Sequence, residues 1–544
     1  MWIFKSLKSH ILQIYSDKKI YLAIAFISGI LMGLTTAPVS AWPLAWVAIA
    51  PLWIQLKRKN EKLKMEENSS FSFKFLIFNS LAWGIGYHGL ALSWITGIHP
   101  MTWLGVPWWP SLAIALFCWA FITLWGAALV AVWAWLFLIF NTPIIERSKS
   151  KFSALISVLI GTALWCALEY LWSSSPLWWT SLSYTQSPHN LAILHLGQLS
   201  GPSASTAAIV AVNGLIAEAW VEGKKNQEEG RKVNFTPYIL AVTLCLILHL
   251  IGFSLYSRPL TEEAKSQLKV GIIQGNVPNE IKFNSEGWGR AMEGYTTGYQ
   301  NLANQGVDAV LTPETALPFV WTNPNQRFDL SLYQAILDRK VVAWVGGFGQ
   351  QENSITNSLF TINGYGELVS RYDKTKLVPL GEYIPFEQFI GKIINRLSPL
   401  DAHLVGGKSK QLFDTPFGRA IVGICYDSAF AEHFRRQAAA GGEFILTASN
   451  DAHYTSAMMA QHHAQDLMRA IEIDRWAVRA TNTGYSAFIN PRGETVWISD
   501  VNSYEVQAAT ISRRKTQTLY VRWGDWLTPL LLVLGAIAQI FQRR

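Results

Sequence analysis

The chain has 544 residues, of which half are apolar, 15% are charged and 25 are tryptophan. Ordinary soluble proteins have about 25% charged residues, so this composition excludes a wholly soluble protein and favours an integral membrane protein. The formal charge of +8 could indicate a nucleic-acid partner. The basic residues, however, gather in short connections between apolar segments, where membrane topology accounts for them.

Eight apolar segments have roughly the 20-residue length that crosses the hydrocarbon core of a bilayer. In chain order they are residues 21–34, 41–56, 75–95, 111–140, 154–172, 203–220, 238–256 and 526–541. Each predicts a transmembrane helix. The charged start, the first apolar run and "PVSA" also fit a cleaved signal peptide, but removing it would disturb the alternation of charged loops, so we expect the first helix to be retained.

Lysine and arginine alternate between the connections. They occur in residues 5–19, 57–64, 147–151, 224–232 and 543–544, whereas the connections 36–40, 96–110 and 174–200 contain neither. Short loops rich in these residues stay in the cytoplasm. We therefore expect both termini on the cytoplasmic side and three parts: a seven-helix membrane domain (1–256), an extracytoplasmic domain (257–525) and a last transmembrane helix (526–544).

The polar domain alternates short apolar runs with helical patterns, notably at 456–480. The runs predict strands at 268–277, 307–318, 341–349, 357–363, 366–374, 419–427, 443–449 and 485–490. This alternation indicates layered α/β packing. Cys425 is the only cysteine of the domain, which excludes a disulfide framework there.

Three stretches of this domain place reactive side chains at strand ends. "LTPETALP" contains Glu314, "SRYDKTKLVPLGEYIPF" contains Lys374 and Glu382, and "IVGICYD" contains Cys425. A thiol becomes a good nucleophile beside a base, and acyl transfer also needs donors for the oxyanion. Taken singly, each residue has a structural alternative: a packed thiol, a glutamate at a helix start or a lysine on a hairpin edge.

Together the motifs resemble a known superfamily. "PE" after a strand, "YDKxxLVPLGEYIP", "GICYD", "SND" at 449–451 and "RAIExxRWxVRATNTGYSAFINPRG" occur in the order typical of the nitrilase, or carbon-nitrogen hydrolase, superfamily. The resemblance implies an αββα sandwich with a Glu-Lys-Cys triad. By position, the acid-base residue matches Glu314, the lysine Lys374 and the nucleophile Cys425. Lys376 instead matches a position where the superfamily commonly has His or Arg.

The helices on either side of the predicted sandwich make the resemblance more specific. Seven helices before the sandwich and one after it, preceded by "TLYVRWGD", are similar to the apolipoprotein N-acyltransferase family, as are "EYLW" near 169 and the stretch 184–201. The implied reaction moves an acyl chain from the sn-1 position of a phospholipid, through a cysteine thioester, to the α-amine of a diacylglyceryl-cysteine at a lipoprotein N-terminus. It implies the bacterial inner membrane and neither a metal nor a diffusible cofactor.

The resemblance also implies supporting residues and shows departures. Glu382 matches an acid beside the triad, and Tyr426 is expected to offer its backbone N–H to the oxyanion. Asp427 stands where the family usually has the longer Glu, and "NDAHY" at 450–454 replaces the usual "NDAWF". These changes put rate and lipid preference in question more than the reaction class.

Three other residues have alternative interpretations. Glu169 lies near the outer end of a helix, where an acid is costly in lipid; Trp172 stands where related sequences often have its Arg partner, so we expect a structural or interfacial role. His462 and His463 could suggest a metal pair. Adjacent residues of a helix point about 100° apart, unlike an i, i+4 pair, so we expect packing or surface positions.

Two other function classes stay open. A membrane-tethered amidase would use the same triad with water as the second nucleophile. A catalytically impaired scaffold or a transporter-like protein is the third possibility. Few ionisable residues in the apolar segments argue against transport, and the intact positions Glu314, Lys374 and Cys425 argue against a scaffold.

Overall fold

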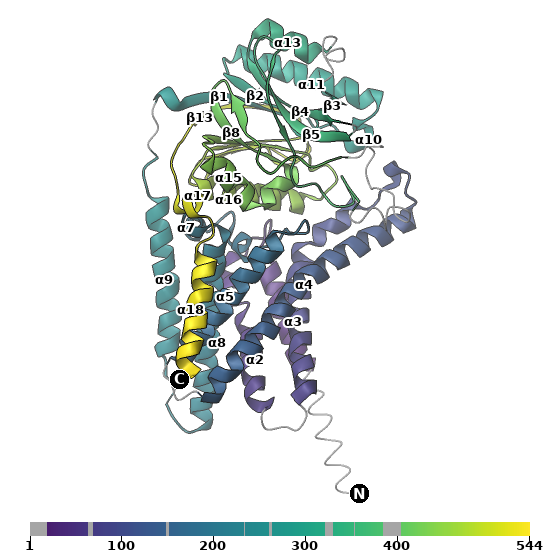
Figure 1. Cartoon of the computed structure of the whole chain (residues 1–544). Coiled ribbons are helices and arrows are strands. Elements are labelled where there is room, and N and C mark those ends of the chain that lie inside the picture. The colour runs from purple at the N-terminus through teal and green to yellow at the C-terminus, as the bar shows by residue number, and fades with distance from the viewer. Residues whose placement is uncertain are drawn as a thin grey trace.

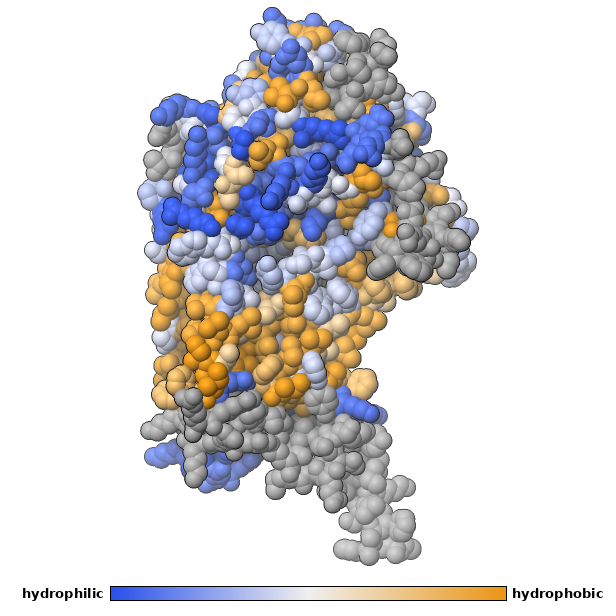
Figure 2. All heavy atoms as spheres, in the orientation of Figure 1, coloured by the Kyte–Doolittle hydropathy of each residue, from blue (hydrophilic) through white to orange (hydrophobic). Residues whose placement is uncertain are grey.

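The computed structural model describes residues 19–63, 69–147, 152–232, 234–260, 264–320, 330–352, 354–384 and 404–543. A helical bundle forms one end of the molecule, and an α/β domain sits on the other (Figure 1). Hydrophobic side chains gather over the bundle and hydrophilic ones over the α/β domain (Figure 2). Most of the basic residues expected near the start of the chain and at 148–151 lie outside the described residues.

The described chain is helical in all eight segments where helices were predicted. The helices are Lys19–Gly33, α2 (Ala50–Leu63), α3 (Ser69–Ala91), α4 (Trp108–Arg147), α5 (Ser153–Ser173), α8 (Pro202–Glu228), α9 (Thr236–Tyr256) and α18 (Leu527–Arg543). Among the described residues, four of them are both long and apolar enough to cross a membrane: α4 over Trp108–Asn141, α5, α8 and α9. The protein is therefore a membrane protein with at least these candidate spans.

The second predicted segment differs from a single helix. The chain forms a 3-10 turn, η1 (Trp42–Trp46), and α2 begins only at Ala50. The Asn213 side chain, from α8, accepts the backbone N–H groups of Ile49 and Ala50 at 2.9 and 3.0 Å. Because these N–H groups have no partner inside α2, a side chain distant in sequence determines where this helix starts.

The α/β domain contains two sheets. The first has the order β13-β1-β2-β4-β5-β6, with β3 also beside β4. Its strands are β1 (Gln267–Gln274), β2 (Ala309–Leu311), β3 (Leu317–Val320), β4 (Val342–Gln351), β5 (Ser354–Ile362), β6 (Leu368–Asp373) and β13 (Glu505–Ser512). The second has the order β12-β11-β10-β9-β8-β7. Its strands are β7 (Phe413–Thr415), β8 (Gly418–Ile424), β9 (Phe444–Ser449), β10 (Ala477–Thr481), β11 (Ala487–Ile489) and β12 (Thr495–Ile498).

The layers follow from which faces are apolar. Val270 and Ile272 of the first sheet and Val422 and Leu446 of the second belong to one buried core. The outer layers are formed by helices (Figure 1): α11 (Ser285–Asn304) and α13 (Ser331–Arg339) on the first sheet, α15 (Ala431–Ala439) and α16 (Ser456–Ile473) on the second. The predicted αββα sandwich is confirmed.

The helix predicted over 456–480 is too long. α16 ends at Ile473, Asp474 takes a left-handed conformation (φ 56°), and β10 follows in the centre of the second sheet. Ala477 and Val478 are fully buried and pair in parallel with β9. Tertiary pairing decided this segment, because its apolar residues fit a strand as well as a helix. β7, β12 and β13 also lay outside the predicted strands.

One buried glutamine of α16 holds the α/β domain on the bundle. Gln461 donates to the carbonyl oxygens of Ala37 (3.0 Å) and Ala91 (2.9 Å). It accepts the indole N–H groups of Trp94 (3.1 Å) and Trp179 (2.7 Å). Since every polar atom of this side chain is satisfied by the membrane part, the contact defines where the second sheet lies over the helices.

Candidate active site

The three residues of the expected triad lie at the ends of three strands. Glu314 follows β2, Lys374 follows β6 and Cys425 follows β8. All three side chains are buried and line one cavity. The two sheets thus bring together residues that are up to 111 positions apart in the chain.

Lys374 lies between two carboxylates. Its Nζ is 2.9 Å from Glu314 Oε1 and 2.9 Å from the Glu382 carboxylate. Burial acts to lower the pKa of Lys374, but the two carboxylates outweigh it and hold that pKa well above its ordinary value. The lysine therefore stays a cation between the two acids.

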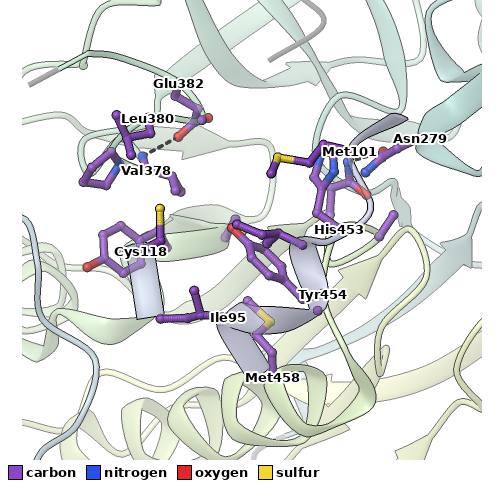
Figure 3. A pocket seen from close by; sticks show the side chains of 18 of the residues that line it. Ile95, Met101, Cys118, Asn279, Val378, Leu380, Glu382, His453, Tyr454 and Met458 are labelled. Atoms are coloured by element: carbon purple, nitrogen blue, oxygen red, sulfur yellow. Dashed lines mark hydrogen bonds between the residues drawn. The ribbon is translucent and has the colours of Figure 1, made fainter. Parts of the chain in front are cut away.

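Asn357 links the same two acids. Its amide Nδ2 donates to Glu314 Oε1 at 2.6 Å and to Glu382 Oε1 at 3.2 Å. The other oxygen of Glu382 accepts the backbone N–H of Val378 at 2.8 Å (Figure 3). Burial raises the pKa of Glu382, although Lys374 opposes this. Sequence reasoning missed Asn357, because an asparagine inside a strand gives no local sign of its partners.

Cys425 has an unusual backbone. It begins the 3-10 turn η6 (Cys425–Ala429) directly after β8, with φ at 49°. A left-handed conformation costs an L-residue about 1–2 kcal/mol, so surrounding contacts must hold it. Burial, assisted by the Glu314 carboxylate, raises the pKa of the Cys425 thiol well above its ordinary value, while Lys374 acts to lower it. The thiol is thus protonated at rest, and it would act as a nucleophile only with a base to take its proton.

Asp427 ties the lysine-bearing loop to the cysteine turn. Its Oδ1 accepts the Thr375 hydroxyl and the Lys376 N–H, both at 2.8 Å. Its Oδ2 accepts the Tyr372 hydroxyl at 2.9 Å and the Ile424 N–H at 3.0 Å. The shorter acid therefore reaches four donors, and the expected deficit against Glu is not seen in its contacts.

Lys376 and Tyr426 take separate positions. The Lys376 ammonium lies 4.4 Å from the centre of the Phe430 ring, away from the carboxylate pair of Lys374. Tyr426 is the second residue of η6, and the first N–H groups of a helical turn have no partner within it. Its hydroxyl donates to the carbonyl oxygens of Pro176 (2.9 Å) and Trp178 (2.8 Å), which anchors the turn on the membrane part.

A second buried charged cluster lies behind Cys425. His462 Nε2 donates to the Cys425 carbonyl oxygen at 2.9 Å, and its Nδ1 is 3.0 Å from Asp451 Oδ1. Arg479 donates to Asp451 Oδ2 at 3.0 Å and also pairs with Asp466. Burial acts to raise the pKa of Asp451, but His462 and Arg479 outweigh it and hold that pKa below its ordinary value.

The structure decides between the packing and surface positions expected for His462 and His463. Both are buried, so the surface alternative is wrong and the packing alternative is right; His463 Nε2 lies 3.0 Å from the Thr495 hydroxyl. Donor atoms of Cys425, Asp451 and His462 lie within 4.8 Å of one another. Both histidine nitrogens already face protein oxygens, and the Arg479 cation adjoins the carboxylate, so this donor set does not fit a metal ion.

Lys282 is a second residue that sequence reasoning missed. It ends α10 (Asn279–Lys282) and is only 3% exposed. Its ammonium donates to the Thr315 hydroxyl at 2.8 Å and to the Glu314 carbonyl oxygen at 3.3 Å. Burial lowers the pKa of Lys282 to about 8. Thr315 has φ at 45°, so this lysine braces a strained turn beside Glu314.

The cavity, of about 830 Å³, joins the two parts of the molecule. Besides the triad and Glu382, its wall includes Phe117, Cys118, Phe121 and Ile122 of α4. Figure 3 shows Cys118 and Glu382 on the same side of this space, with His453 and Tyr454 across it. Phe117 is 61% exposed. The cavity therefore extends from the triad to the outward apolar face of a membrane helix.

The departure at "NDAHY" lines the same cavity. His453 stacks on Trp103, with ring centres 5.3 Å apart and planes at 19°, and Tyr454 meets Trp94 edge to face at 5.2 Å.

Glu169, by contrast, is buried away from the cavity wall. Its carboxylate accepts hydrogen bonds from Trp165, Ser181, Leu182 and Thr206. Polar groups of the bundle replace the missing arginine, as a structural role requires.

Comparison with known proteins agrees with this division of the chain. Residues 28–215 match the family model described as apolipoprotein N-acyltransferase N-terminal domain, and residues 269–520 match carbon-nitrogen hydrolase. The chain is 58% identical to a Nostoc sp. protein named apolipoprotein N-acyltransferase, over 94% of this chain and 98% of that one. It is 50% identical to a Synechocystis sp. protein of the same name, with the same coverage. A crystal structure of an amidase from Nesterenkonia sp. is 17% identical, covering 51% of this chain and 99% of that one, with a TM-score of 0.37.

Proposed function

The chain belongs to the apolipoprotein N-acyltransferase family, and from this premise we propose that Cys425 accepts an acyl chain from a phospholipid and passes it to a lipoprotein. The observation that supports this best is the cavity wall shared by the buried thiol and the exposed apolar face of α4. An acyl chain in the bilayer can reach the nucleophile along that face.

In the first half-reaction, Glu314 takes the proton of the Cys425 thiol as the sulfur attacks the sn-1 ester carbonyl. The S–C bond forms, the ester C–O bond breaks, and the proton moves from Glu314 to the departing lysophospholipid oxygen. Lys374, 2.9 Å from Glu314, and the Tyr426 N–H stabilise the oxyanion. Because the pKa of the thiol is raised, deprotonation is coupled to attack.

In the second half-reaction, the α-amine of an N-terminal diacylglyceryl-cysteine attacks the thioester. Glu314 accepts the amine proton, the C–N bond forms and the C–S bond breaks. The proton then returns to the Cys425 sulfur, which restores the resting enzyme. Glu382 and Asp427 support the triad by holding Lys374 and the cysteine turn, respectively.

The membrane part has an energetic purpose in this scheme. Both substrates are anchored by acyl chains, and each buried CH₂ is worth about 0.8 kcal/mol. Moving such chains from the bilayer into a remote, water-facing pocket would lose this burial free energy. A site whose wall includes Phe117 and Phe121 of α4 avoids that cost.

The proposed topology has eight crossing helices, both termini in the cytoplasm and the α/β domain outside the inner membrane of a bacterial cell. The alternation of lysine and arginine between connections supports it. So does the chain path, since α9 leads into the α/β domain and α18 leaves it. The proposed boundaries are 1–256, 257–525 and 526–544.

The test uses full-length protein in detergent, exposed to phosphatidylethanolamine and analysed by intact-protein mass spectrometry. We expect an acyl-sized adduct that hydroxylamine removes, as a thioester requires. Cys425→Ala should lack it. Cys118→Ala is the matched control, because Cys118 lines the same cavity, and it should keep the adduct. An adduct that persists in Cys425→Ala would overturn the assignment of the nucleophile.

A chase with a diacylated peptide tests the acceptor. The adduct should disappear while the peptide gains one acyl chain that resists hydroxylamine, because the product is an amide. Loss of the adduct with release of free fatty acid and an unchanged peptide would instead indicate water as the second nucleophile, the amidase-like alternative.

A further inference from the structure

A second cavity, of about 960 Å³, lies where the α/β domain meets the end of α9. Its wall combines the end of α9 with α7 (Gly197–Ser200), α17 (Leu519–Trp523) and the segment 513–518 that follows β13. None of Glu314, Lys374 and Cys425 lines it. It is therefore separate from the acyl-transfer site.

The wall of this cavity is strongly basic. Seven of its lining residues are lysine or arginine and two are acidic, an excess of five positive charges. The acids are each paired: Asp474 with Arg514 at 2.9 Å, and Glu443 with Lys515 at 3.3 Å. The active-site cavity is the opposite, since its lining has Lys374 against three glutamates. A basic wall of this kind attracts an anion.

Several of these cations are held in place by the backbone. Arg513 donates to the carbonyl oxygens of Lys265 (2.7 Å) and Ser266 (3.3 Å). Arg492 donates to the Arg258 carbonyl oxygen at 3.0 Å, and among the described residues its buried Nε has no hydrogen-bond partner. Guanidinium groups fixed in this way suit a phosphate, whose oxygens accept several N–H bonds at once.

The position of the cavity points to a lipid. Trp523, on α17 beside the cavity, is 67% exposed, as suits an aromatic residue at the membrane interface. On the membrane side of it, α9 exposes Leu250 and Phe253, and α18 exposes Leu530 and Val533. Figure 2 shows the hydrophilic surface directly above the apolar band. A phosphate in the cavity would thus have apolar helix surfaces beneath it.

We propose that this cavity binds the phosphate head group of an anionic phospholipid, whose acyl chains lie along α9 and α18. The bound lipid anchors the α/β domain to the bilayer on the side away from α4. It is not the acyl donor, so the proposal stands apart from the chemistry at Cys425. Anionic lipid and juxtamembrane cations attract each other, and each lysine or arginine near the bilayer surface adds to that attraction.

The test counts lipids on the full-length protein by native mass spectrometry, in detergent containing phosphatidylglycerol or phosphatidylcholine. The variant combines Lys515→Gln with Arg522→Gln, both exposed residues of the cavity wall. We expect its phosphatidylglycerol affinity to fall about 30-fold, with phosphatidylcholine unaffected. The matched control combines Arg339→Gln with Lys340→Gln, exposed at the far end of α13, and should bind like the parent.

Three readouts make the test decisive. Thioester formation at Cys425 should be unchanged in the double variant, which shows that the variant is folded. If the variant misfolds, the parent protein is tested alone: salt should weaken its binding of phosphatidylglycerol but not of phosphatidylcholine. Equal phosphatidylglycerol binding by parent and variant, or no salt effect, would overturn the proposal. So would inorganic phosphate displacing the lipid at equal concentration, which would identify a site for free phosphate.

Discussion

Two buried charged clusters flank Cys425, and only one of them reaches the cavity. The front cluster, Glu314, Lys374 and Glu382, lines the cavity wall. The rear cluster, Asp451, His462 and Arg479, is fully buried and contributes no residue to that wall. Similar residue types thus serve different purposes, because the front groups can meet substrate and the rear groups cannot.

The two clusters also differ in the groups that pair with them. In the front cluster Lys374 is shared by two carboxylates, which leaves a net negative charge beside the thiol that the proposed reaction deprotonates. In the rear cluster each Asp451 oxygen has a cationic or imidazole partner, and His462 also donates to the Cys425 carbonyl oxygen. In the proposed reaction the front cluster exchanges protons, whereas the rear cluster contacts the left-handed backbone of Cys425 through His462.

The largest expected effect comes from breaking the front cluster. Glu314→Gln removes the base and keeps the side-chain size, so acyl transfer should fall about 10³-fold with thermal stability near that of the parent. The measurement is the rate of acylation of a diacylated peptide. Glu280→Gln is the control, because Glu280 also lines the cavity but contacts no triad residue in the hydrogen bonds described; near-parent activity of Glu314→Gln would refute the assignment.

Breaking the rear cluster should affect folding instead. Arg479→Met leaves Asp451 and Asp466 buried without their shared cation, and loss of one member of a buried pair costs about 3–5 kcal/mol. Denaturation of the detergent-solubilised protein should show that loss. Arg339→Met, at an exposed position of α13, should leave stability unchanged. A stable Arg479→Met protein without activity would place the rear cluster in the chemistry.

The pKa relation between Lys374 and Cys425 gives a pH-dependent test. The raised thiol pKa predicts that iodoacetamide alkylation of Cys425 increases with pH and is still rising above pH 9. Lys374→Met removes the cation that favours the thiolate, so the thiol pKa should rise further and alkylation at pH 9 should slow about tenfold. Peptide-resolved mass spectrometry distinguishes Cys425 from Cys118. Faster alkylation in the variant would contradict the sign.

The smallest expected effect concerns Asp427, which links the loop of Lys374 to the turn that begins at Cys425. Asp427→Glu restores the residue usual in the family but adds a methylene where four hydrogen bonds are already made. Overpacking should lower stability by about 1–3 kcal/mol without raising activity. Thermal unfolding and peptide acylation measure the two quantities. A gain in activity would show that Asp427 limits this enzyme after all.

Sequence patterns predicted the helices and most strands because each depends on local apolar periodicity. The same reasoning extended a helix over 456–480, since "RAIEIDRWAVRA" has apolar residues that fit both periods, and only pairing with β9 makes 477–481 a strand. Asn357 and Lys282 gave no local signal, because their functional neighbours, Glu314 and Thr315, lie more than thirty residues away in the chain.

The sequence by itself determined the membrane class and the sandwich and predicted Glu314, Lys374, Glu382 and Cys425 as a set, because hydropathy and motif order are properties of the chain. Tertiary structure alone decided that Asn357 joins the two carboxylates around Lys374, that Asp427 reaches its donors and that a basic cavity adjoins α9. Charge pairing, burial and backbone strain depend on distances between remote segments, and those distances exist only once the two sheets and the bundle have packed together.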